Sequence, residues 1–482
     1  MKHGRSARAG VLACLLGLSA AACGSDGGSE ESAATTANSA TSAAAGAVTG
    51  GDEPSTWGVK DKKLIGPSGF SADLSTCPSK WSDTAGLSNN EIRLGQSLAQ
   101  SGSAAAYGQI GEGMKAYFAH INAAEGGVAG KKIVYTNKDD GYEAARGKAN
   151  VDEMLETGDL FAFASNLGTP INMATADKVN ESCIPDMFVA SAHAAWADPT
   201  NKPWVFPVPQ IGYASEGLVW GQYVVDTLGK GASVAALVVN NEFGLAYRNS
   251  FDKFAKANGL TVKYELHDPA AASITNEMTS LASTGANAVI LMTLGNYCTQ
   301  GEIYVGQSSW KPQVKLISNT CNTVQFFKPA GAAGDGWVSV TDRYDVGDPD
   351  AQKVKSVQEA RDGLAKAGLD QNNFNQGIGW GQYGWSIVDV LKRASALSGG
   401  LTRTNVLLAA RKVKMQHPFV RDGIVYEMNG NKDSNPIEGG VLARYTVEAG
   451  KDVGTNVAFG KPIDLNGQTP NCAWDGKQCK DY

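Results

Sequence analysis

From about residue 91 onward, short apolar runs alternate with longer segments in which apolar residues recur with the period of a helix. Short runs between turn residues favour strands, and the longer periodic segments favour helices. The first series predicts strands at Ile92–Leu98, Lys132–Thr136, Leu160–Ser165 and Met187–Ala190. It predicts helices at Tyr107–Ala124, Glu143–Glu156 and Ile171–Cys183. This alternation indicates a parallel sheet with helices on both faces.

A second series of the same kind follows Pro207-Val208-Pro209. Its predicted strands are Val234–Val239, Thr261–Leu266, Ala288–Met292 and Val314–Ile317. Its predicted helices are Gly212–Leu228, Phe243–Asn258, Ser273–Ser283 and Thr299–Gln307. Two of these strands are apolar throughout, as a sheet buried on both faces requires. We therefore predict an α/β fold with two doubly wound parallel-sheet lobes.

The C-terminal part breaks this pattern. It offers strands at Gly336–Thr341, Gly423–Met428 and Gly440–Thr446, and helices at Ala351–Ala367, Gly377–Ala396 and Asn405–Arg411. These elements do not make a third domain easily, so we assign them to the two lobes and expect the chain to cross between them several times. The predicted ranges are 91–207 plus 341–423 for lobe 1, 208–340 plus 424–450 for lobe 2, and 58–90 and 451–482 for terminal extensions.

The N-terminus reads as an export signal. A basic start and the apolar run Val11–Leu18 precede Ala20-Ala21-Ala22 and Cys23. This order predicts a lipoprotein signal peptide over residues 1–22, with lipid on Cys23 after cleavage. The alternative is an ordinary signal peptide with a chance cysteine. Residues 23–57, rich in Ser, Ala, Thr and Gly, predict a flexible tether. We expect an extracytoplasmic protein anchored to the bacterial cell membrane by its N-terminal lipid.

The charge of the chain argues against some partners. The formal charge is -6, and cleavage before Cys23 would remove three basic residues and no acidic one, which lowers it to -9. Nucleic-acid binding needs clustered Lys and Arg to displace counterions, so no nucleic-acid partner is predicted.

Six cysteines remain after processing. An even number in an exported protein favours three disulfides, although the sequence alone permits many pairings. We prefer Cys298–Cys321, Cys472–Cys479 and, by elimination, Cys77–Cys183. Metal binding is the other interpretation, but there is no paired CxxC motif and the histidines are scattered, so no metal site is predicted.

Ligands of open α/β sheets bind beyond the carboxyl ends of the strands, so the loops there are the candidate site. After the strand at Leu160–Ser165, Asn166 and Thr169 precede Pro170. Thr is a favoured N-cap and Pro a favoured first helical residue, so a helix starting there would aim free N–H groups at a carboxylate. The alternative is that Thr169 only caps its own helix.

The other strands are followed by loops with an aromatic or a small hydrogen-bonding residue. Such a mixture is typical of a small-molecule cleft. The candidates in these loops are Ser101, Tyr107, Phe243, Asn296 and Thr320.

Catalytic patterns are missing from the sequence. There is no GxSxG nucleophile elbow, no HExxH motif and no GxxxxGK[ST] phosphate loop. His193 follows a strand but has no evident nucleophile partner. We therefore predict neither an enzyme nor a cofactor.

Several short motifs occur in an order that is specific although no single motif is. They are Ser101-Gly102, Tyr107-Gly108, Ile121-Asn122-Ala123, Glu125-Gly126-Gly127, Asp139-Asp140 and Arg343-Tyr344-Asp345. With them, the chain from about residue 91 to 446 resembles the branched-chain amino-acid-type (leucine-binding-protein-like) solute-binding lipoproteins of ABC importers. That family has the type I periplasmic binding fold.

The resemblance implies two lobes joined by three crossovers, near Pro207, Val340 and Val425. A small-molecule ligand would bind between the lobes, which would close over it by a hinge motion. The closed protein, expected to be a monomer, would dock on an ABC permease. A ligand-sensing receptor component with the same clamshell is the second hypothesis, and an extracellular hydrolase is a minor third.

The resemblance also implies roles for single loops. The loop matching Asn166–Thr169 holds the ligand carboxylate, the loop matching Ala192-His193-Ala194 adds contacts, and an aromatic at Phe243 packs on the ligand. The acidic residue that holds an ammonium group is replaced by Thr320 here. A buried ammonium without a carboxylate is costly, so a neutral or carboxylate-bearing solute fits better than an α-amino acid, unless Glu242 substitutes.

Overall fold

The computed structural model describes residues 56–451, 453–467, 469–476 and 479. The predictions for the signal peptide, for Cys23 and for nearly all of the tether fall outside this part of the chain. No helix within the described part is long and apolar enough to cross a bilayer.

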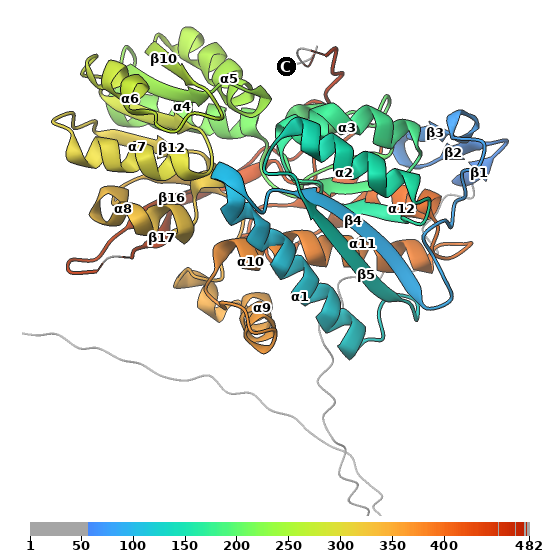
Figure 1. Cartoon of the computed structure of the whole chain (residues 1–482). Helices are drawn as coiled ribbons and strands as arrows, with labels where there is room; N and C mark the ends of the chain where they lie inside the picture. The colour runs from blue at the N-terminus through green and yellow to red at the C-terminus, as the bar shows by residue number, and fades with distance from the viewer. Residues whose placement is uncertain (1–55, 452, 468, 477–478, 480–482) are drawn as a thin grey trace, which may run out of the picture. The chain divides into compact units, whose positions relative to one another are not determined.

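The first lobe is built on a five-stranded parallel sheet with the order β5-β4-β6-β7-β8 (Figure 1). Its strands are β4 (Glu91–Leu98), β5 (Lys132–Asp139), β6 (Ala162–Ala164), β7 (Asp186–Val189) and β8 (Val205–Pro207). The connecting helices are α1 (Gly108–Ala124), α2 (Ala144–Glu156) and α3 (Thr169–Glu181). Sequence reasoning missed β8, because three residues next to a proline carry too little pattern.

The second lobe has a seven-stranded sheet with the order β10-β9-β11-β12-β13-β16-β17. Its strands are β9 (Ser233–Val239), β10 (Thr261–His267), β11 (Ala288–Met292), β12 (Val314–Ile317), β13 (Val338–Thr341), β16 (Gly439–Thr446) and β17 (Thr455–Asp464). Its helices are α4 (Tyr213–Leu228), α5 (Glu242–Asn258), α6 (Thr275–Ala282), α7 (Asn296–Gln307) and α8 (Val324–Ala330). The sheet is parallel through β13, whereas β16 and β17 are antiparallel additions.

The helices after β13 return to the first lobe (Figure 1). They are α9 (Lys355–Lys366), α10 (Phe374–Ile378), α11 (Ser386–Ala396) and α12 (Arg403–Ala410), with a π-helical stretch at Gly379–Trp385. Helices α9 and α10 and the π-helical stretch pack against α1, whereas α12 packs against α11. The closest approach of α1 to α10 is at a glycine. A Cβ on Gly113 would lie 2.0 Å from the carbonyl oxygen of Gln376, so no larger residue fits there.

The chain crosses between the lobes three times, but one predicted position is wrong. The first two crossovers follow β8 and β13, close to Pro207 and Val340. Near Val425, however, β15 (Tyr426–Asn429) pairs antiparallel with β14 (Lys412–Met415). Ser68 also donates a hydrogen bond of 2.8 Å to Asn429 on the first-lobe side. The third crossover therefore follows Asn429, because the predicted strand belongs to a hairpin whose partner has no apolar run.

The N-terminal extension forms a small antiparallel sheet attached to the first lobe. Its strands are β1 (Gly58–Lys60), β2 (Lys63–Ile65) and β3 (Ser71–Asp73). Phe70 is fully buried, and the guanidinium of Arg411 lies 5.3 Å above its ring. Trp81 donates its indole N–H to the carbonyl oxygen of Cys183 at 2.7 Å.

The three predicted disulfides are confirmed: Cys77–Cys183, Cys298–Cys321 and Cys472–Cys479. The first joins the extension to the first lobe. The second joins the start of α7 to the turn after β12, so it ties together two loops at the carboxyl ends of the second sheet.

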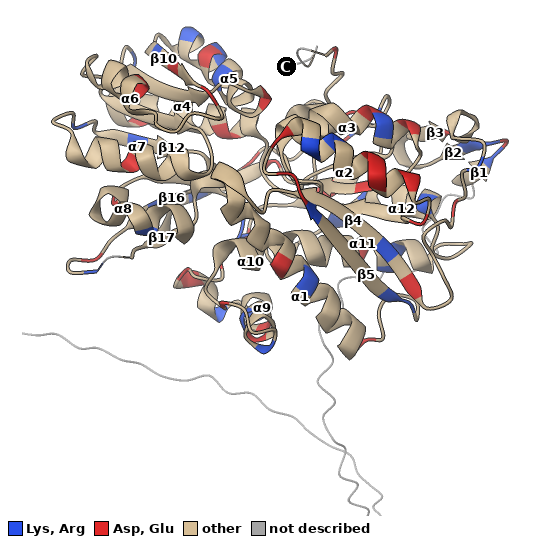
Figure 2. Cartoon of the chain, in the orientation of Figure 1, with Lys and Arg blue, Asp and Glu red and all other residues tan. Residues whose placement is uncertain are grey.

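Charged residues are mixed over the described surface. In the view of Figure 2, Lys and Arg alternate with Asp and Glu along helices such as α3, α5 and α9. Neighbouring charges often pair, as Lys178 does with Asp152 at 2.5 Å.

Removing Cys77–Cys183 or Cys472–Cys479 by double Cys→Ser substitution tests the contribution of each bridge to stability. The loop-entropy account predicts losses of about 4.8 kcal/mol for the bridge across 106 residues and about 2.4 kcal/mol for the bridge across 7 residues. Urea unfolding of the two variants measures both values. An equal loss, or the reverse order, would contradict the entropic account for this chain.

Candidate functional site

A cavity lies between the two lobes and is lined by residues of both. Its empty volume is about 560 Å³, part of it open to solvent, within the size range of small-molecule sites. Its wall is mainly aromatic and aliphatic. The aromatic lining residues are Tyr107, Tyr142, Tyr213, Phe243, Phe374 and Tyr383.

Tyr107 holds the two lobes together across this cavity. It stands at the start of α1 in the first lobe. Its hydroxyl donates to the carbonyl oxygen of Thr320 at 3.0 Å and accepts the N–H of Gly295 at 3.1 Å, both in the second lobe. Its ring packs edge-on against Phe326 with a centroid distance of 5.6 Å. The structure is therefore a closed state.

Gly295 allows this close approach of the lobes. Its φ is +64°, which favours glycine. A Cβ at this position would lie 2.4 Å from the carbonyl oxygen of Ser103 in the first lobe. Any larger residue would hold the lobes apart.

The start of α3, predicted to bind a carboxylate, is occupied by the protein's own side chains. Asn166 is buried, accepts the N–H of Ser97 at 2.8 Å and donates to Asp186 at 2.9 Å. Thr169 is also fully buried and shares a hydrogen bond of 2.8 Å with Ser191. Neither lines the cavity. The prediction that Thr169 caps α3 is wrong, since the helix starts at Thr169 and its N-cap is Gly168.

Two tyrosines, Tyr142 and Tyr213, line the cavity at this end. A Cβ on Gly168, the N-cap of α3, would lie 2.9 Å from the Tyr142 ring, so that ring packs against the start of the helix. Burial raises the pKa of Tyr142 and that of Tyr213.

The other predicted site residues divide into two groups. Tyr107, Phe243 and Thr320 line the cavity. Ser101 does not, because its hydroxyl donates to Asp139 at 2.6 Å, and Asn296 is exposed at the first turn of α7. Glu242 is exposed on α5 and is not a lining residue, so it does not replace the missing ammonium ligand.

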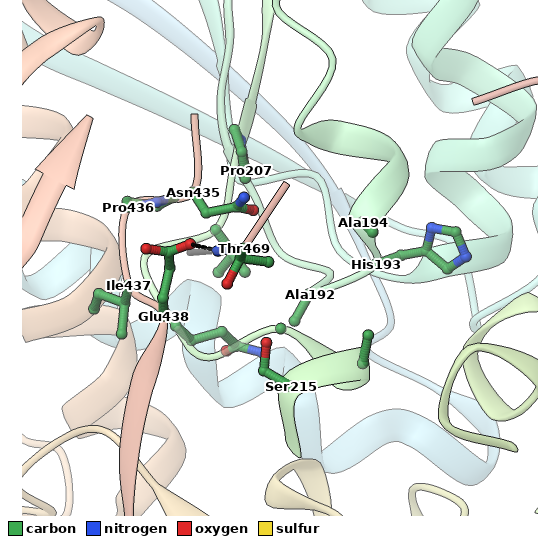
Figure 3. Close-up of a pocket in the computed structure, with 14 residues that line it drawn as sticks. Ala192, His193, Ala194, Pro207, Ser215, Asn435, Pro436, Ile437, Glu438 and Thr469 are labelled. Atoms are coloured by element: carbon green, nitrogen blue, oxygen red, sulfur yellow. Dashed lines mark hydrogen bonds between the residues drawn. The ribbon is translucent and has the colours of Figure 1, made fainter. Parts of the chain in front are cut away.

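Ala192 and His193 line a second cavity, beside the crossovers, with an empty volume of about 400 Å³ (Figure 3). The His193 ring points away from this space. Its Nδ1 accepts the N–H of Ala195 at 3.1 Å, and burial lowers the pKa of His193 to about 4. The imidazole is therefore neutral near pH 7.

Sequence reasoning missed several lining residues on or near the crossovers, on α10 and in the π-helical stretch after it. They include Gln210, Arg343, Asn375 and Tyr383. Arg343 belongs to a motif that carried the family resemblance, but nothing marked it as a site residue. Tyr383 lies in the π-helical stretch Gly379–Trp385, which the sequence analysis did not connect with the site. Within the described residues, the Tyr383 hydroxyl has no hydrogen-bond partner, and it lines the cavity.

Arg343 is the centre of a buried polar network at the first two crossovers. Its guanidinium donates to Gln382 at 2.5 Å and to the side chain of Asn319, and lies 3.4 Å from Asp342. Asp342 accepts the N–H of Ile211 at 2.6 Å. The network thus joins the segment after β13, the segment after β8 and the turn after β12.

Glu216 holds the far end of this network. Its carboxyl group is fully buried, accepts the N–H of Asn319 at 2.8 Å and receives the Tyr247 hydroxyl at 2.5 Å. Burial raises the pKa of Glu216 to about 8, against the effect of these two hydrogen bonds. The side chain is therefore largely protonated at neutral pH and adds little negative charge to the site.

No group of His, Cys, Asp and Glu side chains within the described residues is arranged to hold a metal ion. No carboxylate is among the residues that line the cavity between the lobes. The arrangement can enclose an apolar body and hydrogen-bond a polar end near Arg343, Gln210 and Tyr383.

Residues 91–445 match the model of a family described as periplasmic binding protein. No curated protein sequence matches the chain. Solved structures share its fold. One is a fatty acid ABC transporter substrate-binding protein from Thermomonospora curvata, with 16% identity and a TM-score of 0.67, over 85% of this chain and 98% of that one.

Two further solved structures carry ligands. A branched-chain amino acid ABC transporter protein from Thermus thermophilus with bound valine is 19% identical, with a TM-score of 0.68, over 78% of this chain and 97% of that one. A solute-binding protein of an ABC transporter from Rhodopseudomonas palustris BisB5, in complex with 3,4-dihydroxy benzoic acid, is 17% identical, with a TM-score of 0.65, over 79% and 99%. Such identities show a common fold only.

Substituting Glu216→Gln should flatten the dependence of stability on pH. Because the folded-state pKa of Glu216 is raised from 4.5 to about 8, the native state binds the proton more tightly than the unfolded state. Its contribution to stability is therefore lost as pH rises from about 4.5 to 8, at up to about 1.4 kcal/mol per pH unit. Urea unfolding at several pH values measures the slope for both proteins.

The exposed Glu242 offers a matched control, since Glu242→Gln removes a carboxyl group of the same type outside the network. Parallel pH profiles for the unaltered protein and Glu216→Gln would contradict the role assigned to Glu216.

Proposed function

Because this chain belongs to the periplasmic binding protein family, we propose that it is the substrate-binding subunit of an ABC importer. It captures a small organic solute between its lobes and presents the closed form to a membrane permease. The observation that carries this proposal is the cavity walled by both lobes and bridged by Tyr107. In this proposal the protein binds the solute and does not convert it.

The proposed location is outside the cytoplasm, with a lipid on Cys23 as the membrane anchor. Three disulfides support an oxidising compartment, since such bonds persist mainly in exported proteins. The proposal of a lipid anchor rests on the signal-like sequence before Cys23.

The proposed ligand is an aromatic or branched aliphatic acid or amide. One observation disfavours an α-amino acid: no carboxylate is among the lining residues to hold an ammonium group. The aromatic wall suits an apolar body. The polar end of the ligand would face Arg343, Gln210 and the free hydroxyl of Tyr383 at the crossovers.

A thermal-shift screen with matched ligand pairs tests this preference. We expect 3-phenylpropanoate or 4-methylpentanoate to raise the melting temperature more than phenylalanine or leucine, which carry an added ammonium group. A ligand at 100 times its dissociation constant adds about 2.7 kcal/mol to stability. Tighter binding of the amino acid in both pairs would overturn the proposed ligand class.

The variant Tyr383→Phe tests the polar end of the site. Loss of one hydroxyl that hydrogen-bonds the ligand should weaken binding of an acid or amide about 2- to 13-fold, since such a bond contributes about 0.5–1.5 kcal/mol. Titration calorimetry measures the change. Tyr297→Phe is the matched control, because its hydroxyl bonds Pro269 and Ala271 within the second lobe. Equal affinities for the two variants would refute the assignment of Tyr383.

The same clamshell could instead report its ligand to a membrane sensor. Reconstitution with a permease and ATPase separates the two functions, since only an importer subunit stimulates uptake. If the purified protein converts the bound solute chemically, both hypotheses are wrong and the hydrolase hypothesis is favoured.

A further inference from the structure

The chain after β17 runs from the second lobe back to the first. We call this segment the C-terminal strap and define it by the described residues 465–467, 469–476 and 479. It leaves β17, the edge strand of the second sheet. At its far end the N–H of Cys472 donates to the carbonyl oxygen of Ala197 in the first lobe at 2.8 Å. Trp474 packs there against the buried cluster that contains Val189 and Trp196.

Between these ends the strap is bound along the third crossover. The carboxylate of Glu438, which is almost fully buried, accepts the N–H groups of Gly467 and Thr469, the latter at 2.9 Å. Asn471 accepts the N–H and the hydroxyl of Ser434 at 3.1 and 2.6 Å and donates to the carbonyl oxygen of Asn431 at 2.6 Å. The strap and the third crossover therefore form one doubled connection.

The strap also reaches the back of the ligand cavity. The indole of Trp474 stands edge-on to the ring of His193, with a centroid distance of 4.9 Å. His193 belongs to the loop that contains Ala192, whose carbonyl oxygen accepts the N–H of Tyr213 at 3.1 Å. Tyr213 lines the cavity between the lobes. A continuous series of contacts therefore connects Trp474 of the strap with Tyr213 of the candidate ligand site.

The cavity drawn in Figure 3 lies where the strap, the crossovers and both lobes meet. Its wall combines the loop at Ala192–Ala194 of the first lobe, Ser215 of the second lobe, the first crossover, residues 435–438 of the third crossover and Thr469 of the strap. A rotation of one lobe against the other changes the distances across this junction. The strap spans it and is anchored on both sides.

We propose that the C-terminal strap is a fourth connection between the lobes that favours the closed state and positions the loop at Ala192–Ala194 for ligand binding. Its contacts with the first lobe, through Trp474 and Cys472, and with Glu438 are all made in the closed arrangement. Opening must strain or break some of them. The disulfide Cys472–Cys479 holds the end of the strap in the shape that presents Trp474. This inference rests on the proposed function only in naming the cavity as the ligand site.

Spin-label distances test the strap without any ligand. Labels on Lys115→Cys in α1 and Lys253→Cys in α5 report the separation of the lobes, and both positions are exposed. We expect Trp474→Ala to increase the open population of the empty protein about 5- to 10-fold. The affinity for any ligand found in the screen should fall by at most the same factor, because only the closed-competent fraction binds.

Two further variants keep the result interpretable. Glu438→Gln preserves the shape of the side chain but weakens its hold on Gly467 and Thr469, so a smaller shift in the same direction is expected. Trp81→Ala removes an indole of the first lobe that lies outside the strap, and should leave the distance distribution unchanged.

An unchanged distance distribution in both Trp474→Ala and Glu438→Gln would overturn the inference, whatever happens to the melting temperature. A shifted distribution in a protein that binds none of the screened solutes would support the strap and count against the proposed function instead.

Discussion

The buried guanidinium of Arg343 is the interaction on which the two-lobed structure depends. It lies where the chain leaves the second sheet for the first lobe, and it links Gln382 and Asn319 beside Asp342. Losing one partner of a buried ion pair destabilises a protein by about 3–5 kcal/mol, because the remaining charge is left uncompensated. The network therefore fixes the relative placement of the crossovers. It also places the one cationic side chain that lines the cavity.

The placement of the crossovers also determines where the candidate ligand site lies. The loops after the parallel strands converge on the space between the lobes, and Tyr107 closes it by bonding two second-lobe loops. Where the family resemblance implied a carboxylate-binding loop, Asn166 and Thr169 bond other side chains and backbone groups of the protein. Arg343, Gln210 and Tyr383, which line the cavity at or near the crossovers, offer polar groups to a ligand instead.

Sequence reasoning succeeded where local pattern decides structure. The strands at Ala288–Met292 and Val314–Ile317 were predicted to the residue because each is an apolar run with clear ends. It failed where distant partners decide. Asn166 hydrogen-bonds Ser97 and Asp186, and Thr169 hydrogen-bonds Ser191, so neither side chain lines the cavity. These partners are distant in the sequence, so no local pattern predicts the contacts. Strand β17 was missed because its mixed Gly, Lys and Pro content hides an edge strand that needs little burial.

A structure determined with the bound solute tests the central claim most directly. The account predicts ligand density enclosed by Tyr107, Phe243 and Phe374, with the polar end of the ligand toward Arg343 and Tyr383. Density with the polar end of the ligand at the start of α3, or density outside the space between the lobes, would contradict it.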